Sequence, residues 1–165
     1  MRTTFINQNS ENTIVEEGEK HMKSRLEDLE YYSVFGSVYD DGDFIDTLKD
    51  QDFDLEETEQ AIDNYRNLSL FSEYGLSFDF VAVGTFDDQE EAYYRFQFSW
   101  GGPSEELRFY EDGTIIFAYM EWFSGVGFDV SNEDSVIWLY EMYVDTESIN
   151  WANIPYEERY TEDAE

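Results

Sequence analysis

Residues Ala92–Trp100, AYYRFQFSW, decide the fold class, because aromatic side chains occupy every second position. That period of two is typical of a β-strand with one buried face. The aromatic face consists of Tyr94, Phe96, Phe98 and Trp100. The same period predicts strands in three further segments, 77–86, 105–111 and 114–123. Short connections, including the hairpin signal Asp112-Gly113, indicate a four-stranded antiparallel meander over about residues 77–123.

Segments with apolar residues at helical spacing lie on both sides of the strands. They predict helices over about residues 16–32, 55–67 and 132–144. Residues 1–13 are polar and aperiodic and predict a flexible N-terminal arm, whereas residues 151–165 predict a mobile acidic tail. Gly125-Val126-Gly127 lacks the third glycine of a dinucleotide-binding loop and is interpreted as an ordinary loop. The sequence therefore predicts one α+β domain over residues 14–150, with helices on one face of the sheet.

The composition predicts a folded protein with an extremely acidic exterior. Forty Asp and Glu oppose nine Lys and Arg, which gives a formal net charge of −31. Aromatic residues make up 19% of the chain, whereas disordered acidic chains are poor in aromatics. Repulsion from other polyanions excludes direct binding to nucleic acid or to an anionic membrane. No segment approaches the ~18 apolar residues of a membrane span and no secretory signal is recognisable, so we expect a cytoplasmic protein.

The acidic residues are clustered rather than evenly spread. Eleven of the 24 residues from Asp40 to Asp63 are Asp or Glu, and Lys49 is the only cation among them. Like-charge repulsion destabilises such a stretch, so we expect an external partner to account for it. A second cluster lies in the predicted turn between the first two strands. Together the two clusters give fifteen candidate partner-binding residues: Asp40, Asp41, Asp43, Asp46, Asp50, Asp52, Asp54, Glu56, Glu57, Glu59, Asp63, Asp87, Asp88, Glu90 and Glu91.

Catalytic machinery is mostly missing from the sequence. The chain has one His and no Cys, which excludes thiolate chemistry and Cys-based metal sites. Asp40-Asp41-Gly42-Asp43 fails as a calcium loop, because the required acidic positions hold Ser37, Tyr39 and Leu48. A pair of catalytic carboxylates stays open as an alternative, since 40 acids supply such a pair by chance. We therefore expect a protein that is not an enzyme and that needs no cofactor or metal.

Two other features have structural interpretations. The basic cluster of the first predicted helix is expected on a solvated face that pairs with nearby Glu, with His21 as an exposed polar residue. This cluster consists of Lys20, His21, Lys23 and Arg25. Trp100, which precedes Gly101-Gly102-Pro103, is expected to be a buried aromatic at the end of a strand.

In size, extreme acidity, abundant aromatics and lack of cysteine, the chain resembles the acidic DNA-mimic anti-defence proteins of phages and mobile elements, the class that contains Ocr and the ArdA antirestriction proteins. Residues Ser99–Glu106 are also similar to a stretch of small phage and plasmid proteins. The resemblance implies inhibition of a restriction enzyme, a CRISPR effector or another DNA-handling complex of a bacterial cell. The partner surface would be the basic surface that normally binds DNA or RNA.

Spacing within the acidic stretch is compatible with phosphate mimicry. Carboxylates at Asp50, Asp52 and Asp54 would lie roughly 6.5–7 Å apart in an extended segment, and those at Glu56 and Glu59 roughly 5–6 Å apart on a helix. Two copies of the chain could also pair and lengthen such a surface.

Three other functions compete with DNA mimicry. An immunity protein would neutralise a nuclease toxin through a compact acidic and aromatic patch, whereas a DNA mimic needs an elongated stripe. Adaptation to high salt would spread the acids evenly. A carboxylate-based enzyme is the third.

Overall fold

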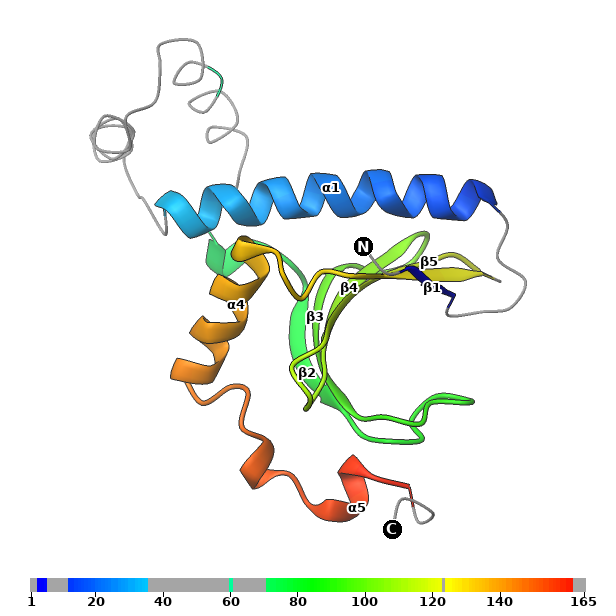
Figure 1. The fold of residues 1–165 in the computed structure, drawn as a ribbon, viewed down its shortest axis with the longest axis vertical. Helices are drawn as coiled ribbons and strands as arrows, with labels where there is room; N and C mark the ends of the chain where they lie inside the picture. Colours follow the sequence, from blue (N-terminus) through cyan, green and yellow to red (C-terminus); the bar gives the residue numbers. More distant parts are fainter. Residues whose placement is uncertain (1–2, 6–11, 36–59, 61–70, 123, 162–165) are drawn as a thin grey trace.

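The computed structural model describes residues 3–5, 12–35, 60, 71–122 and 124–161. In this part of the chain the protein has an α+β fold, as predicted, with helices packed on an antiparallel sheet (Figure 1). The sheet has six strands in the order β1-β6-β5-β4-β3-β2. The prediction of four strands is therefore too low by two.

The central part of the sheet is the predicted meander. It consists of β2 (Ser77–Val81), β3 (Tyr93–Ser99), β4 (Ser104–Phe109) and β5 (Ile115–Met120), each antiparallel to the next. The first strand ends five residues before its predicted end, and residues 82–92 form a hairpin loop. Between β4 and β5 the backbone N–H of Tyr110 donates to the carbonyl of Thr114, and Gly113 has a φ of +87°. A glycine with positive φ fits the last position of a three-residue hairpin loop, one residue longer than the predicted turn.

The two strands that the sequence pattern missed lie next to each other at one edge. β6 (Gly125–Asp129) pairs with β5, and β1 (Thr3–Phe5) pairs with β6. The interpretation of Gly125-Val126-Gly127 as a loop is therefore wrong, and the predicted flexible arm contains a strand. Val126 and Phe128 are fully buried, whereas the glycines alternate with them on the other face. The period of two is present in β6. Because Gly125 and Gly127 have no side chain, a count of alternating apolar and polar residues does not detect it.

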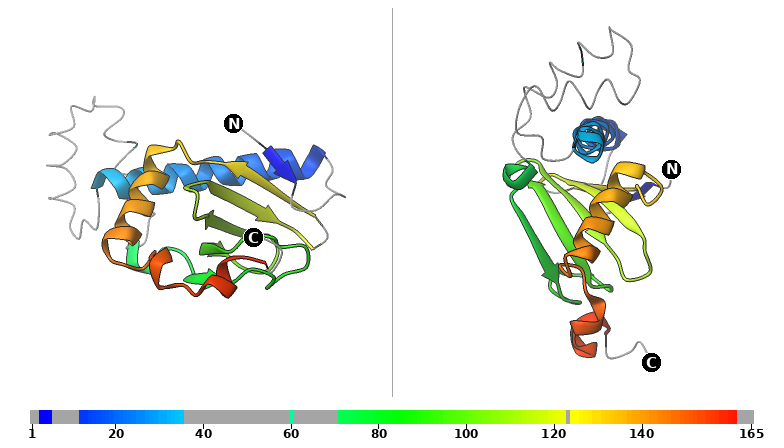
Figure 2. Two further views of the ribbon diagram at one scale, coloured as in Figure 1. Left: turned by 60° about the horizontal axis from the view of Figure 1, so that its bottom comes forward. Right: turned by 90° about the vertical axis from the view of Figure 1, so that its left-hand side faces the viewer.

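Two long helices cover one face of the sheet. Helix α1 (Asn12–Phe35) contains the predicted helix 16–32 and begins four residues earlier. Helix α4 (Asp134–Asp145) lies within two residues of its predicted bounds and packs against α1. Figures 1 and 2 show α1 crossing the β5–β6 end of the sheet and α4 lying over its face. The predicted helix 55–67 lies outside the described residues except for Gln60, which is helical.

The predicted acidic tail is partly ordered against the sheet. It contains the short helices η2 (Trp151–Asn153) and α5 (Tyr156–Arg159). The indole of Trp151 packs edge-on against Phe80 and Tyr94, with ring centroids 5.9 and 5.1 Å apart. The backbone N–H of Val83 donates to the carbonyl of Glu158 at 2.8 Å. Residues 151–160 thus pack on the same domain, because their aromatic groups bury surface that a mobile tail would leave exposed.

The core lies between the sheet and the helices and is rich in aromatic rings. Tyr94, Phe96 and Phe98 of the predicted aromatic face are buried, as are Leu107 and Phe109 of β4. Trp100 is the exception, since 69% of its surface is exposed and the prediction of a buried ring is wrong. A further helix, the short η1 (Phe71–Glu73), places Phe71 against Trp138 of α4. Among the described residues, no helix is long and apolar enough to cross a membrane.

Candidate binding groove on the open face of the sheet

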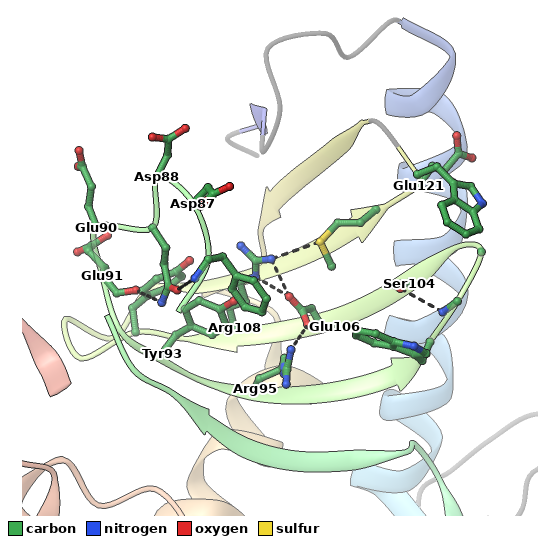
Figure 3. Close-up of a pocket in the computed structure, with 18 residues that line it drawn as sticks. Asp87, Asp88, Glu90, Glu91, Tyr93, Arg95, Ser104, Glu106, Arg108 and Glu121 are labelled. Atoms are coloured by element: carbon green, nitrogen blue, oxygen red, sulfur yellow. Dashed lines mark hydrogen bonds and ion pairs between the residues drawn. The ribbon is translucent and has the colours of Figure 1, made fainter. Parts of the chain in front are cut away.

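The face of the sheet opposite α1 and α4 carries a hollow of about 790 Å³ (Figure 3). Side chains alternate along a strand, so the neighbours of the core residues point to this face. They include Tyr93 and Arg95 from β3 and Glu106 and Arg108 from β4. We call this hollow, with its floor on β3 and β4 and its walls from the adjoining loops, the groove.

Ion pairs hold the polar floor of the groove together. Glu106, which is almost fully buried, accepts a hydrogen bond from Nε of Arg108 at 2.7 Å. Nη1 of Arg95 lies 3.8 Å from the same carboxylate, and Arg95 also donates two hydrogen bonds to Asp79 at 2.9 and 2.6 Å. The guanidinium of Arg108 lies over the ring of Tyr93, 4.8 Å from its centroid. Each positive charge on the floor therefore faces a carboxylate of the same chain.

These contacts fix the charge state of the floor. Burial alone lowers the pKa of Arg108, but the adjacent Glu106 carboxylate outweighs it, so the pKa of Arg108 is raised above its ordinary value. The hydrogen bond to Asp79 likewise raises the pKa of Arg95. Burial raises the pKa of Tyr93 to about 12. At neutral pH both arginines are thus charged and Tyr93 keeps its proton.

One wall of the groove is the acidic loop between β2 and β3. Its side chains Asp87, Asp88, Glu90 and Glu91 are all exposed and line the groove. Gln89 fixes the loop, because its amide donates to the carbonyls of Ala82 and Glu91 and its oxygen accepts from the N–H of Phe86. Asp88 has a φ of +60°, a left-handed conformation that Asp tolerates better than most residues. Figure 3 shows the four carboxylates grouped at one end of the groove.

Large aromatic side chains form the remaining rim. Trp122, which follows β5, is 88% exposed, and Trp100, which follows β3, is 69% exposed. Both line the groove, as does the half-exposed Phe86 of the acidic loop. Gly101 and Gly102 have φ angles of +82° and +80°, so the chain turns directly after Trp100 in a way that residues with a Cβ rarely adopt.

The structure brings together only part of the predicted site. Asp87, Asp88, Glu90 and Glu91 lie side by side on the groove wall. The other eleven candidates lie outside the described residues: Asp40, Asp41, Asp43, Asp46, Asp50, Asp52, Asp54, Glu56, Glu57, Glu59 and Asp63.

Sequence reasoning missed the floor and the aromatic rim. Arg95, Glu106 and Arg108 occupy strand positions that alternate with buried Phe and Leu, so charged residues at those positions were a signal of a second, polar face. The period of two predicts Trp100 in the core. Trp122 lies an odd number of residues from the buried Phe117 and Tyr119, so the same period places it on the opposite face, but the sequence gives no sign of a groove there.

The basic cluster on α1 also differs from its prediction. His21 and Arg25 do not simply face solvent, because both contact Glu105, a buried carboxylate on the core side of β4. Arg25 Nη2 lies 2.9 Å from the Glu105 carboxylate, and the hydroxyl of Ser99 donates to it at 2.8 Å. Lys23 behaves as predicted and pairs with Glu19 on the helix surface. Glu105 therefore anchors α1 to the sheet.

Comparison with known proteins gives no match to a protein-family model, to a curated protein sequence or to a solved structure.

Proposed function

We propose that this protein is a DNA-mimic inhibitor, which binds the basic nucleic-acid-binding surface of another protein through its carboxylates. Its partner would be a restriction enzyme, a CRISPR effector or another DNA- or RNA-binding protein in the cytoplasm of a bacterial cell. The protein would act by binding and not by catalysis, without contacting nucleic acid or a membrane itself.

The distribution of charge pairs is the observation that supports this function. The four arginines of the described residues all pair with carboxylates of the same chain: Arg25 with Glu105, Arg95 with Asp79 and Glu106, Arg108 with Glu106, and Arg159 with Glu111. Within the same part of the chain, Asp87, Asp88, Glu90 and Glu91 have no ion pair and are exposed. The arginines of the described residues are thus neutralised internally, while the acidic loop stays available to an external cationic partner.

A competition experiment tests the proposal. The full chain is immobilised, DNA-binding proteins are captured from a bacterial lysate, and the bound fraction is challenged with duplex DNA or with increasing salt. A DNA mimic predicts that duplex DNA displaces the captured protein and that retention falls steeply between about 50 and 200 mM salt. Capture that duplex DNA leaves unchanged would contradict DNA mimicry.

Two charge variants locate the binding surface. The groove variant Asp87→Asn/Asp88→Asn/Glu90→Gln/Glu91→Gln removes four charges from the acidic loop. The control variant Glu16→Gln/Glu27→Gln/Glu30→Gln/Glu141→Gln removes four exposed charges from α1 and α4. Both variants have the same net charge, so a larger loss of binding in the groove variant reports on position and not on total charge. Equal losses would assign the binding to general electrostatic attraction.

The shape of the groove favours a second candidate, an immunity protein or other acidic inhibitor of a nuclease toxin. Exposed Trp100 and Trp122 line the same hollow as four carboxylates, which is the combination of aromatic and acidic side chains that such an inhibitor requires. Apolar contacts are insensitive to ionic strength, so this function predicts one partner that is retained at high salt. The same salt elution therefore separates the two functions.

A further inference from the structure

We infer that the groove binds a segment of the partner protein that carries arginine or lysine side chains, with one cation against the carboxylates of the acidic loop and another against the indoles of Trp100 and Trp122. This inference deepens the proposed function and rests on it for the identity of the partner as a basic protein.

The charge of the groove selects a cation. Six carboxylates line it, against the two arginines Arg95 and Arg108. Because both arginines pair with Glu106 or Asp79, an anionic ligand would have to break those pairs before it could bind the arginines. The exposed acids on the wall have no such partner among the described residues. A cation therefore gains charge pairing without the loss of an internal contact.

The two tryptophans select a cation that belongs to a larger, partly apolar ligand. Indole is the best aromatic ring for cation–π contacts, and arginine is the cation found most often in them. Exposed Trp is also among the residues that most often dominate the binding energy of protein interfaces. A free inorganic cation would bury little of the Trp122 side chain, 88% of whose surface is exposed. An extended peptide segment can place one cationic side chain against these rings and another against the acidic loop.

A polar group inside the groove has no partner in the described structure. Tyr93 is 99% buried, and its hydroxyl, which belongs to a residue lining the groove, makes no hydrogen bond within the described residues. Buried hydroxyls are almost always hydrogen-bonded, so this one leaves a hydrogen-bonding group at the groove that a bound ligand can partner. Figure 3 shows Tyr93 beside Arg108, between the acidic wall and the floor. A peptide carbonyl or guanidinium group supplies suitable hydrogen-bonding atoms.

The volume fits a short peptide segment. A hollow of about 790 Å³ lies within the range of sites that hold a drug-sized ligand, roughly 300–1,000 Å³. That is far more than one metal ion requires and far less than a folded domain. The groove therefore takes one or two side chains of a protruding loop or tail.

Peptide binding to the full chain tests the inference. The probe is a fluorescently labelled, terminally blocked peptide with two arginines in a Gly/Ser background, measured by anisotropy at about 0.15 M salt. The comparison peptide carries citrulline, which is uncharged and has the shape of arginine. Binding of the arginine peptide with at least tenfold weaker binding of the citrulline peptide is the expected result.

The decisive variants are Trp100→Ala and Trp122→Ala, which leave the net charge unchanged. Each should weaken binding of the arginine peptide by about tenfold. Leu76→Ala removes an exposed apolar side chain (61% exposed) outside the groove and should bind like the unaltered chain. Circular dichroism confirms that each variant is folded, as expected for exposed positions.

The outcomes separate this inference from the proposed function. Three results would overturn the inference, even if duplex DNA displaces the captured proteins. They are unchanged binding by the tryptophan variants, equal binding of the citrulline and arginine peptides, and no binding of the arginine peptide to the unaltered chain. If, conversely, peptide binding requires the tryptophans but duplex DNA does not displace the captured proteins, the inference is upheld and DNA mimicry is rejected.

Discussion

At the scale of single residues, the fold depends on a few charged groups placed where aliphatic side chains are expected. Glu105 and Glu106 are adjacent in the sequence but point to opposite faces of β4, and both are almost fully buried. Glu105 joins the sheet to α1 through Arg25 and His21, and Glu106 joins the two arginines of the groove floor. Each carboxylate is tolerated in the interior because it is paired and hydrogen-bonded.

Substitution of Glu105 by Gln should therefore destabilise the protein. The change removes the closer of two carboxylates from the guanidinium of Arg25, which is only a quarter exposed, and leaves it Asp28, whose carboxylate lies 3.9 Å from Nη1. Breaking a buried pair in this way costs about 3–5 kcal/mol, and partial exposure of Arg25 reduces the expected loss in unfolding free energy to about 2 kcal/mol. Urea denaturation measures it. Glu27→Gln, an exposed position of α1, serves as the control and should change stability by less than about 0.5 kcal/mol.

The same pair predicts a pH dependence. Burial alone raises the pKa of Glu105, but the hydrogen bonds from Arg25 and Ser99 outweigh it and hold the pKa below its ordinary value of 4.5. A carboxylate with a lowered pKa in the folded state stabilises fully above pH 4.5 and loses this contribution as the pH falls through its folded pKa. The difference in unfolding free energy between the unaltered chain and Glu105→Gln should shrink as the pH falls from about 4.5 to 3. A constant difference down to pH 3 would contradict this role.

At the scale of elements, α1 and β6 approach each other closely at Gly18. A Cβ atom at this position would lie 2.7 Å from Cγ1 of Val126 and 3.1 Å from Cε2 of Phe128. Both neighbours are fully buried in β6 and have little room to move. Gly18 thus sets the distance between α1 and the sheet. The contacts of His21 and Arg25 with Glu105 depend on the same distance.

The variant Gly18→Ala distinguishes close packing from helix propensity. Ala favours the helix by about 1 kcal/mol, so an unpacked helix would be stabilised. Overpacking against β6 costs about 1–3 kcal/mol and should produce a net loss of stability in urea denaturation. Ser24→Ala, at an exposed position of the same helix, should instead be neutral or slightly stabilising. Increased stability of Gly18→Ala would show that the helix lies farther from the sheet.

At the scale of the whole molecule, a net charge of −31 opposes the compact state. Aromatic packing offsets this repulsion, because rings from β2, β3, β4, α4 and the C-terminal segment form a continuous cluster. The groove lies on the other side of the sheet, so the exposed carboxylates of its acidic loop add to the repulsion without contributing to the core.

Salt should therefore act in opposite directions on folding and on binding. Raising NaCl from about 0.05 to 0.5 M shortens the range of charge repulsion and should increase the melting temperature of the free chain. The same change should weaken capture of a DNA-binding partner. Thermal melts and the salt elution described above provide the two measurements. A melting temperature that falls with salt would show that attractive pairs, and not repulsion, dominate the electrostatics of the fold.

The α+β class, the meander from β2 to β5 and the positions of α1 and α4 can be predicted from the sequence, because periods of two and 3.6 are local properties of the chain. The sequence could not identify β1 and β6, since a three-residue edge strand and a glycine-rich strand are defined by the partners they pair with. The clustering of Asp87, Asp88, Glu90 and Glu91 predicts them as partner-binding residues, but it does not show which residues line the groove with them. That Trp100 and Trp122 share a groove with these acids is visible in the tertiary structure alone. The reason is the curvature and register of the sheet, which bring residues far apart in the sequence to one surface.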